Sequence, residues 1–289
     1  MNSRKDYELT SLIASYYLAG VDINMPSKTR RQVQKIIRRL KSALTQPLKV
    51  KDVHVFYRLS DGGHPKIKPS YISNENCLRN FEQQFGQEKI YLIADNVSDS
   101  TWNHIQKNYP TMRCERTSLG GQAASFNYAL DLALKLPSKD GRYFVEDDYL
   151  HRKNSYDVLI EGLELGTDYV TLYDCPDTYD GEGTPRYFEE VNPTVEGGGE
   201  ITKVFLSKTC HWKLTNSATM TFASTVKVLR RDESVLRKWT AKKLTQSFWM
   251  FMELREEGKS LVNPLPGYAT HGENKWFCPL VDWNSVANS

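Results

Sequence analysis

The sequence predicts an α/β fold in which a mostly parallel central sheet is flanked by helices. From residue 50 onward, short runs of β-branched and aromatic residues alternate with amphipathic segments of helical period. Strands that alternate with helices usually form a parallel sheet, because each helix carries the chain back to the edge where the strand began. The composition is that of a globular chain, since 39% of the 289 residues are hydrophobic and 25% are charged.

Charge, hydropathy and cysteine content exclude several classes of protein. The net charge of +3 does not indicate binding to nucleic acid. No run approaches ~18 uninterrupted apolar residues, so no membrane-spanning helix is expected. The first residues lack the apolar core of a signal peptide. The five cysteines are scattered and odd in number, which favours reduced thiols. We therefore expect a cytoplasmic protein.

Residues 1–49 are predicted to form an N-terminal helical extension. Apolar residues recur at helical spacing over 7–18, and a second amphipathic stretch follows Pro26. Within it, residues 28–41 hold seven basic and no acidic side chains. The simpler interpretation of this pattern is a solvated helix face. The alternative is peripheral contact with an anionic membrane surface, at the inner face of a membrane, or with a lipid-linked acceptor.

The remaining elements follow from local periodicity and turn residues. Strands are predicted at 53–57, 89–94, 142–145 and 219–229, and helices at 74–85, 101–108, 122–136 and 232–258. Residues 180–200 are rich in Gly, Pro and acidic side chains, so we expect a mobile lid or a disordered loop. The tail from Leu261 is expected to be irregular and aromatic.

Carboxylates gather where the predicted strands end. Arg58 and Asp61 follow the first strand, Asp95 ends the second, and Glu146-Asp147-Asp148 follows the third. Residues 146–200 hold fifteen acidic and three basic side chains. Carboxylates that converge at one edge repel each other unless a cation lies among them, and Mg²⁺ and Mn²⁺ favour such oxygen ligands. The sequence therefore predicts a divalent metal site at this edge.

A second feature suggests an anion next to that metal. Residues 118–121 (Ser-Leu-Gly-Gly) lead into the N-terminus of a predicted helix. Glycines allow a close backbone approach, and the free N–H groups of a helix start favour an anion. A metal site beside an anion site suggests a diphosphate ligand.

Three blocks of the sequence resemble the GT-A glycosyltransferases, which use nucleotide sugars and carry a DxD motif. Residues 93–101 are similar to the family pattern of an apolar run followed by D-D-G-S-x-D-x-T. Residues 120–129 resemble the G-x-x-x-A-R-N-x-A helix start. Residues 144–148 resemble the D-x-D that follows an apolar strand, with Glu146 in place of the first Asp. The blocks occur in the family order, and the resemblance covers roughly 50–175.

The resemblance implies a metal-dependent transfer of a sugar from a nucleoside-diphosphate sugar, linked to UDP or GDP, to a glycan, a lipid-linked molecule or another acceptor. It implies a catalytic domain at 50–289, with a nucleotide-binding half at 50–150 and an acceptor half and C-terminal loop at 151–289. The implied residues for the nucleotide sugar are Tyr57, Arg58, Asp61, Asp95, Gly120, Gly121, Asn127 and Asp147. The implied ligands of Mn²⁺ or Mg²⁺ are Glu146, Asp148 and, from the C-terminal loop, His271.

The general base is not evident from the sequence. Residues 248–258 resemble the acceptor-side helix of the family, E-D-W-x-x-x-x-R-L-x-x-x-G. In inverting members the E-D at its start supplies the base, but here Gln246 and Ser247 stand at those positions, and neither accepts a proton at neutral pH. The candidate substitutes are Asp174, Asp177, Asp232 and Glu233, and the stereochemistry stays open.

Two other functions remain open at this point. One is a sugar-phosphate nucleotidyltransferase, although residues 58–63 match its Gly-rich opening loop poorly. The other is a non-catalytic carbohydrate-binding protein on a decayed GT-A fold, which the Gln246-Ser247 pair would suit. A nucleotide that stabilises the protein only together with a metal would favour a transferase.

Overall fold

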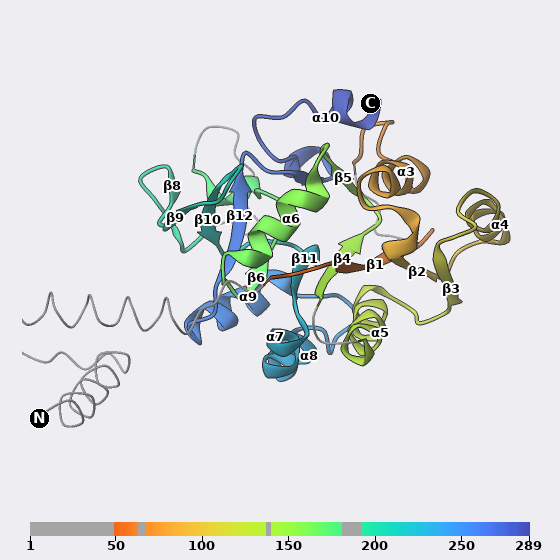
Figure 1. Cartoon of the computed structure of the whole chain (residues 1–289), viewed down its shortest axis with the longest axis horizontal. Coiled ribbons are helices and arrows are strands. Elements are labelled where there is room, and N and C mark those ends of the chain that lie inside the picture. The colour runs from red at the N-terminus through yellow and green to blue at the C-terminus, as the bar shows by residue number, and fades with distance from the viewer. Residues whose placement is uncertain (1–48, 63–66, 137–139, 181–191) are drawn as a thin grey trace, which may run out of the picture. The chain divides into compact units, whose positions relative to one another are not determined.

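The computed structural model describes residues 49–62, 67–136, 140–180 and 192–289 (Figure 1). The extension expected at 1–49 lies outside the described residues, apart from Lys49, and so does its basic stretch at 28–41. In the part of the chain that is described, no helix is both long and apolar enough to cross a membrane.

The centre of the unit formed by residues 49–289 is a nine-stranded sheet. In spatial order its strands are β3 (Arg113–Thr117), β2 (Ile90–Asp95), β1 (Val53–Leu59), β4 (Gly141–Glu146), β11 (Phe222–Thr225), β6 (Tyr169–Val170), β12 (Leu261–Leu265), β10 (His211–Thr215) and β9 (Val204–Leu206). Strands β3, β2, β1 and β4 are parallel, as are β6 and β12. Both β11 and β10 are antiparallel to their two neighbours. Seven of the nine strands therefore share one direction, which confirms the predicted mostly parallel sheet.

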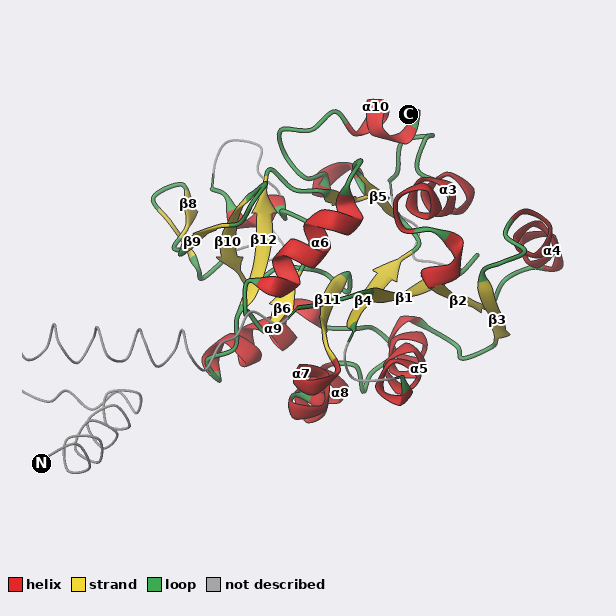
Figure 2. Cartoon of the chain, in the orientation of Figure 1, coloured by secondary structure: helices red, strands yellow, loops and turns green. Residues whose placement is uncertain are grey.

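Helices cover both faces of this sheet (Figure 2). One face carries α3 (Asn74–Phe85) and α6 (Ser155–Glu164). The other face carries α5 (Gln122–Lys135), α7 (Val226–Arg231), α8 (Glu233–Trp239) and α9 (Ser247–Glu256). The remaining helices are α4 (Asp99–Asn108), which connects β2 to β3, and α10 (Trp283–Ala287), which packs against α3.

Strand β1 shows why the sequence forms a sheet that is covered on both sides. Side chains alternate between the two faces of a strand. Val55 and Tyr57 belong to the core under α3 and α6, whereas Phe56 belongs to the core under α5. All three are fully buried. Such a strand is held from both faces, so Arg58 near its end and the residues that follow Leu59 are placed firmly at the sheet edge.

Two predicted elements at 219–258 differ from the structure. The strand expected at 219–229 is limited to β11, because the Thr225 hydroxyl accepts a hydrogen bond from the Val228 amide and begins α7. The helix expected at 232–258 is broken into α8 and α9. The Thr240 hydroxyl donates to the Leu236 carbonyl at 2.8 Å, which satisfies the last turn of α8 locally and lets the chain leave the helix.

The tail expected to be irregular contains two strands and a helix, so that prediction was wrong. Strand β12 pairs with β10 along its whole length and accommodates Pro264 opposite Trp212. Prolines at 264 and 266 disguise the strand in the sequence, because a central strand seldom contains Pro. Strand β13 (Ala269–His271) then pairs antiparallel with β5 (Tyr149–His151).

Further elements were not anticipated from the sequence, among them β3, α6 and the short strands β5, β6, β9 and β10. Strand β3 is a polar edge strand with little apolar alternation, and α6 lacks an N-terminal side-chain cap. In the loop expected at 180–200, residues 181–191 are outside the described residues, and the rest includes a hairpin of β7 (Val195–Glu196) and β8 (Gly199–Glu200).

Candidate functional site

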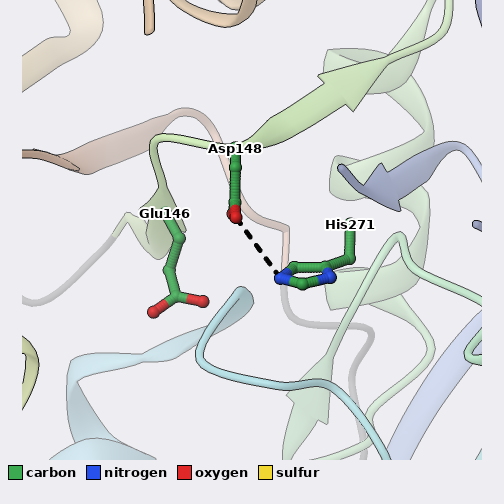
Figure 3. Close-up of side chains that lie close together, drawn as sticks. All are labelled: Glu146, Asp148 and His271. Atoms are coloured by element: carbon green, nitrogen blue, oxygen red, sulfur yellow. Dashed lines mark ion pairs between the residues drawn. The ribbon is translucent and has the colours of Figure 1, made fainter. Parts of the chain in front are cut away.

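The acidic residues that follow β4 lie beside a histidine from the C-terminal tail. Ligand atoms of Glu146, Asp148 and His271 lie within 4.8 Å of one another, and all three residues are buried. The Nε2 atom of His271 is 3.4 Å from Oδ2 of Asp148 (Figure 3). The pairing of β13 with β5 brings them together, because His271 lies opposite Tyr149, the residue after Asp148.

Glu146 is fixed by a buried arginine and a glutamine. Nη2 of Arg58 and Nε2 of Gln122 both donate to Oε1 of Glu146, at 3.2 and 2.5 Å. Arg58 also donates to the carbonyls of Gln122 and Met220, and it is only 5% exposed. The sequence suggested that Arg58 borders the nucleotide. In the structure it lines the pocket described below, and its polar contacts orient Glu146.

Asp147 differs from its neighbours in what it contacts. Its carboxylate accepts a hydrogen bond from the Ser60 amide at 2.8 Å, and its carbonyl accepts one from the Tyr57 hydroxyl at 3.4 Å. These bonds join the end of β4 to the end of β1. Burial, reinforced by the nearby charge of Asp148, raises the pKa of Asp147 to about 7. Through its hydrogen bond to the Asp147 carbonyl, the buried Tyr57 supports the turn that carries the carboxylates.

Lys68 is a site residue that the sequence reasoning missed. Its Nζ atom is 3.1 Å from Oδ2 of Asp148, the same oxygen that faces His271. Lys68 belongs to a connection with no helical or strand period, so nothing local marks it. Gln122 was also missed, although its position directly after Gly121 at the helix start is a usable signal.

A pocket of 780 Å³ opens beside these carboxylates at the carboxyl ends of β1, β2 and β4. Ligands of open α/β sheets bind at this edge. The predicted site residues that line it are Arg58, Asp95, Gly120, Gly121, Glu146, Asp147 and Asp148. The loop between α8 and α9 contributes Lys243, Leu244 and Thr245, which the sequence reasoning did not include.

Another part of the pocket lining combines a carboxylate with a helix N-terminus. Asp95 accepts hydrogen bonds from the Leu119 amide at 2.6 Å and the Thr117 hydroxyl at 3.1 Å, which fix its orientation. Gly120 has a φ of 90°, a conformation that favours glycine. Gly121 caps α5 without a side-chain hydrogen bond, which suits an anion, and among the first N–H groups that of Ala123 donates to the Lys243 carbonyl at 3.4 Å.

Two residues predicted to bind the nucleotide make other contacts. At the start of α4, the Asp61 carboxylate accepts hydrogen bonds from the Ser98 amide and the Thr101 hydroxyl, both at 2.8 Å. Asn127 donates to the Thr240 carbonyl at 3.0 Å and holds α5 against the end of α8. Neither lines the pocket.

The four candidate bases lie in different environments. Asp174 is 3.2 Å from Nζ of Lys213. Asp232 accepts a hydrogen bond from the Tyr169 hydroxyl at 2.7 Å and pairs with Arg231. Strand β11 runs antiparallel to β4 and ends beside Gly141, the first residue of β4. Asp232 follows α7, which begins there, so Asp232 lies at the sheet edge opposite Glu146. Glu233, the fourth candidate, pairs with Arg237 in its own helix.

Asp177 is a buried candidate that contacts the β10–β11 connection. Its Oδ2 accepts a hydrogen bond from the Ser217 hydroxyl at 3.4 Å. Among the described residues it forms no ion pair within 4.0 Å, and burial raises its pKa. The same connection carries Met220 and Thr221, which contact Arg58 and the Glu146 amide.

The residues at the carboxylate group fit a divalent cation. Two carboxylates and one imidazole converge, and carboxylate oxygens together with an imidazole suit Mn²⁺. Mg²⁺ prefers an all-oxygen shell, so His271 favours Mn²⁺ of the two. The chemistry of the donor set thus matches the metal expected from the sequence.

At the level of sequence, no protein-family model and no curated protein matches the chain. Solved structures do. A crystal structure of GalNAc-T7 with UDP, GalNAc and Mn²⁺ aligns with a TM-score of 0.50 at 12% identity, over 81% of this chain and 46% of that one. The described chain has the GT-A fold. It spans about half the length of GalNAc-T7.

Two further structures align less well. Residues 1–349 of TarS from S. aureus give a TM-score of 0.42 at 11% identity, over 78% of this chain and 59% of that one. A putative glucose-1-phosphate thymidylyltransferase from Bacillus anthracis, in complex with a sucrose, gives a TM-score of 0.48 at 10% identity. The alignment covers 82% of this chain and 94% of that one. At such identities the likeness concerns the fold alone.

Replacing His271 with alanine should weaken Mn²⁺ binding in the presence of a nucleoside diphosphate. Loss of even an outer-shell partner of a metal ligand typically costs roughly 10- to 100-fold in affinity, and a direct ligand should cost at least as much. Calorimetric titration of Mn²⁺ measures the effect. The control is His104→Ala, which replaces a half-exposed histidine of α4. Equal Mn²⁺ affinity in wild type and His271→Ala would remove His271 from the metal site.

Proposed function

We propose that the chain is a metal-dependent glycosyltransferase that uses a UDP- or GDP-linked sugar and transfers the sugar to a glycan, a lipid-linked molecule or another acceptor. One observation carries the proposal. The Glu146, Asp148 and His271 group lies beside a pocket that is also lined by the glycine-capped N-terminus of α5. A diphosphate is the ligand that needs both a cation and such a helix start.

The roles of the individual residues follow from their contacts. Asp95, fixed by Leu119 and Thr117, can accept a hydrogen bond from the base or the ribose. The first turn of α5 can donate N–H groups to phosphate oxygens. Arg58 and Gln122 hold Glu146 toward the cation position. When bound, Mn²⁺ or Mg²⁺ would neutralise the charge that develops on the departing nucleoside diphosphate.

We propose Asp177 as the general base. Asp174 forms an ion pair with Lys213, and Asp232 forms one with Arg231. Asp232 also lies at the sheet edge opposite Glu146. Burial raises the pKa of both Asp174 and Asp177, which suits a group that must take up a proton, and of the two only Asp174 has an ion-pair partner among the described residues. The start of α9 offers Gln246 and Ser247 at the positions where inverting relatives of the resembled family carry acids.

The experiment that tests this function is thermal unfolding with nucleotides, with and without metal. We expect UDP or GDP to raise the melting temperature together with Mn²⁺ and to have little effect alone. A ligand at 100 times its Kd stabilises the folded state by about 2.7 kcal/mol. Slow metal-dependent hydrolysis of one nucleotide sugar should follow in a screen of donors.

Other outcomes separate the alternatives. Release of pyrophosphate from a nucleoside triphosphate and a sugar phosphate would identify a nucleotidyltransferase. Metal-dependent nucleotide binding without hydrolysis or transfer, for any donor, would indicate a binding protein on this fold. Absence of any nucleotide effect, with or without Mn²⁺, would contradict the proposal.

A further inference from the structure

Two side chains approach the same oxygen atom of Asp148. Nζ of Lys68 lies 3.1 Å from Oδ2, and Nε2 of His271 lies 3.4 Å from it. The Asp148 side chain is 4% exposed, whereas that of Lys68 is 27% exposed. Lys68 also lines the pocket. One oxygen of a buried carboxylate therefore faces both an expected metal ligand and a cation that belongs to the protein.

Lys68 serves the electrostatics of the site when no divalent cation is bound. Glu146, Asp147 and Asp148 are consecutive in the chain, and Glu146 and Asp148 are buried. Burying a carboxylate is costly unless an opposite charge compensates it. Arg58 compensates Glu146, and Lys68 compensates Asp148. The ammonium group thus does for Asp148 what a metal ion would do.

The same contact opposes the metal. A divalent cation bound by Oδ2 of Asp148 would lie next to the ammonium group, and like charges at contact distance repel strongly. The backbone beside Lys68 is fixed, because the Ile67 carbonyl accepts a hydrogen bond from the Asn274 amide at 3.0 Å. The flexible four-carbon side chain is therefore the part that can move, and the pocket is the space next to it.

We propose that Lys68 is an exchangeable counter-ion: it neutralises Asp148 before loading and moves to the diphosphate of the donor when the metal takes its place. The inference rests on the proposed function, because it needs the metal and the diphosphate. Such an exchange makes the binding of the metal and the binding of the nucleotide cooperative. Metal alone must displace Lys68, whereas metal and nucleotide together give Lys68 a new anionic partner, so each should bind more tightly in the presence of the other.

The test is the Lys68→Met variant, which keeps most of the length of the unbranched side chain and removes its charge. We expect Mn²⁺ alone to bind about tenfold more tightly than to wild type, and UDP or GDP in saturating Mn²⁺ to bind about tenfold more weakly. Lys68→Arg, which keeps the charge, should stay close to wild type in both titrations. Calorimetry, or electron paramagnetic resonance of free Mn²⁺, measures these affinities without any turnover.

Lys89→Met is the matched control. Lys89 has a similar exposure to Lys68 and pairs with Asp52 at 2.7 Å, but it precedes β2 at the sheet edge opposite the pocket. The control loses the same net charge, and its affinities should stay within about twofold of wild type. Circular dichroism of each variant checks folding, and Lys68→Gln replaces Lys68→Met if the latter does not fold.

The outcomes separate this inference from the proposed function. If wild type binds Mn²⁺ and the nucleotide, and Lys68→Met binds Mn²⁺ equally or more weakly, Lys68 is not a competing counter-ion and the inference fails alone. If no variant binds Mn²⁺ or Mg²⁺, with or without nucleotide, the proposed function fails and the inference with it. Mn²⁺ binding by Lys68→Met where wild type binds none would support the inference.

Discussion

Replacing Asp148 with asparagine is expected to abolish metal-dependent sugar transfer while leaving the fold intact. Asp148 is the residue of the candidate metal group that both His271 and Lys68 approach. A Lewis acid contributes several kcal/mol to a transition state, so the loss should be roughly a thousandfold in rate. Stability should change little, because the substitution relieves repulsion among adjacent carboxylates and the Lys68 ammonium group, whose side chain is 27% exposed, can turn to solvent.

The measurements are the transfer rate in saturating Mn²⁺, the Mn²⁺ affinity and the thermal midpoint. Asp99→Asn is the matched control, since Asp99 is 87% exposed and pairs with Arg116 in a different part of the chain. We expect the control to match wild type in all three. Near-wild-type transfer by Asp148→Asn in Mn²⁺ would show that Asp148 does not bind the metal.

The Arg58→Met variant should lose much of its stability, by about 3–5 kcal/mol, the range for removing one partner of a buried ion pair. Arg58 is 5% exposed and holds Glu146, Gln122 and Met220 through hydrogen bonds. Methionine fills much of the volume but leaves the Glu146 carboxylate buried without its cation. The free energy of unfolding in urea measures the effect.

A double variant isolates the cause. Arg58→Met with Glu146→Gln removes both charges, and replacing both members of a buried pair is often close to neutral. We therefore expect the double variant to recover a large part of the lost stability, although it loses a candidate metal ligand. An Arg58→Met protein within 1 kcal/mol of wild type would be at odds with an ion pair that matters for folding.

The sheet and the carboxylates at its edge were predictable because they depend on local pattern. Val53 to Tyr57 alternate between two cores, and each predicted strand in this half ends in polar residues. In a parallel sheet such ends meet at one edge, so Asp95 and Glu146 could be placed near each other without tertiary information. His271 came from the family resemblance alone.

The rest depends on contacts between distant segments. Arg58 was expected at the nucleotide, but the paths of β4 and the β10–β11 connection bury it against Glu146 and Met220. Lys68 has no periodic context, and its proximity to Asp148 arises only from the fold. Asp232 looked equivalent to Asp177 in the sequence, and the direction of β11 separates them.

The pairing of β13 with β5 has a consequence for the length of the chain. His271 lies opposite Tyr149, and shifting such a pairing by one residue turns every side chain of the strand to the other face. Gly272 also lies so close to Asp148 that an added Cβ would be 2.6 Å from its carbonyl oxygen. The length of the connection from β12 to β13 therefore sets the register of β13 and the position of His271. Gaining or losing one residue there would remove the histidine from the site without any substitution in it.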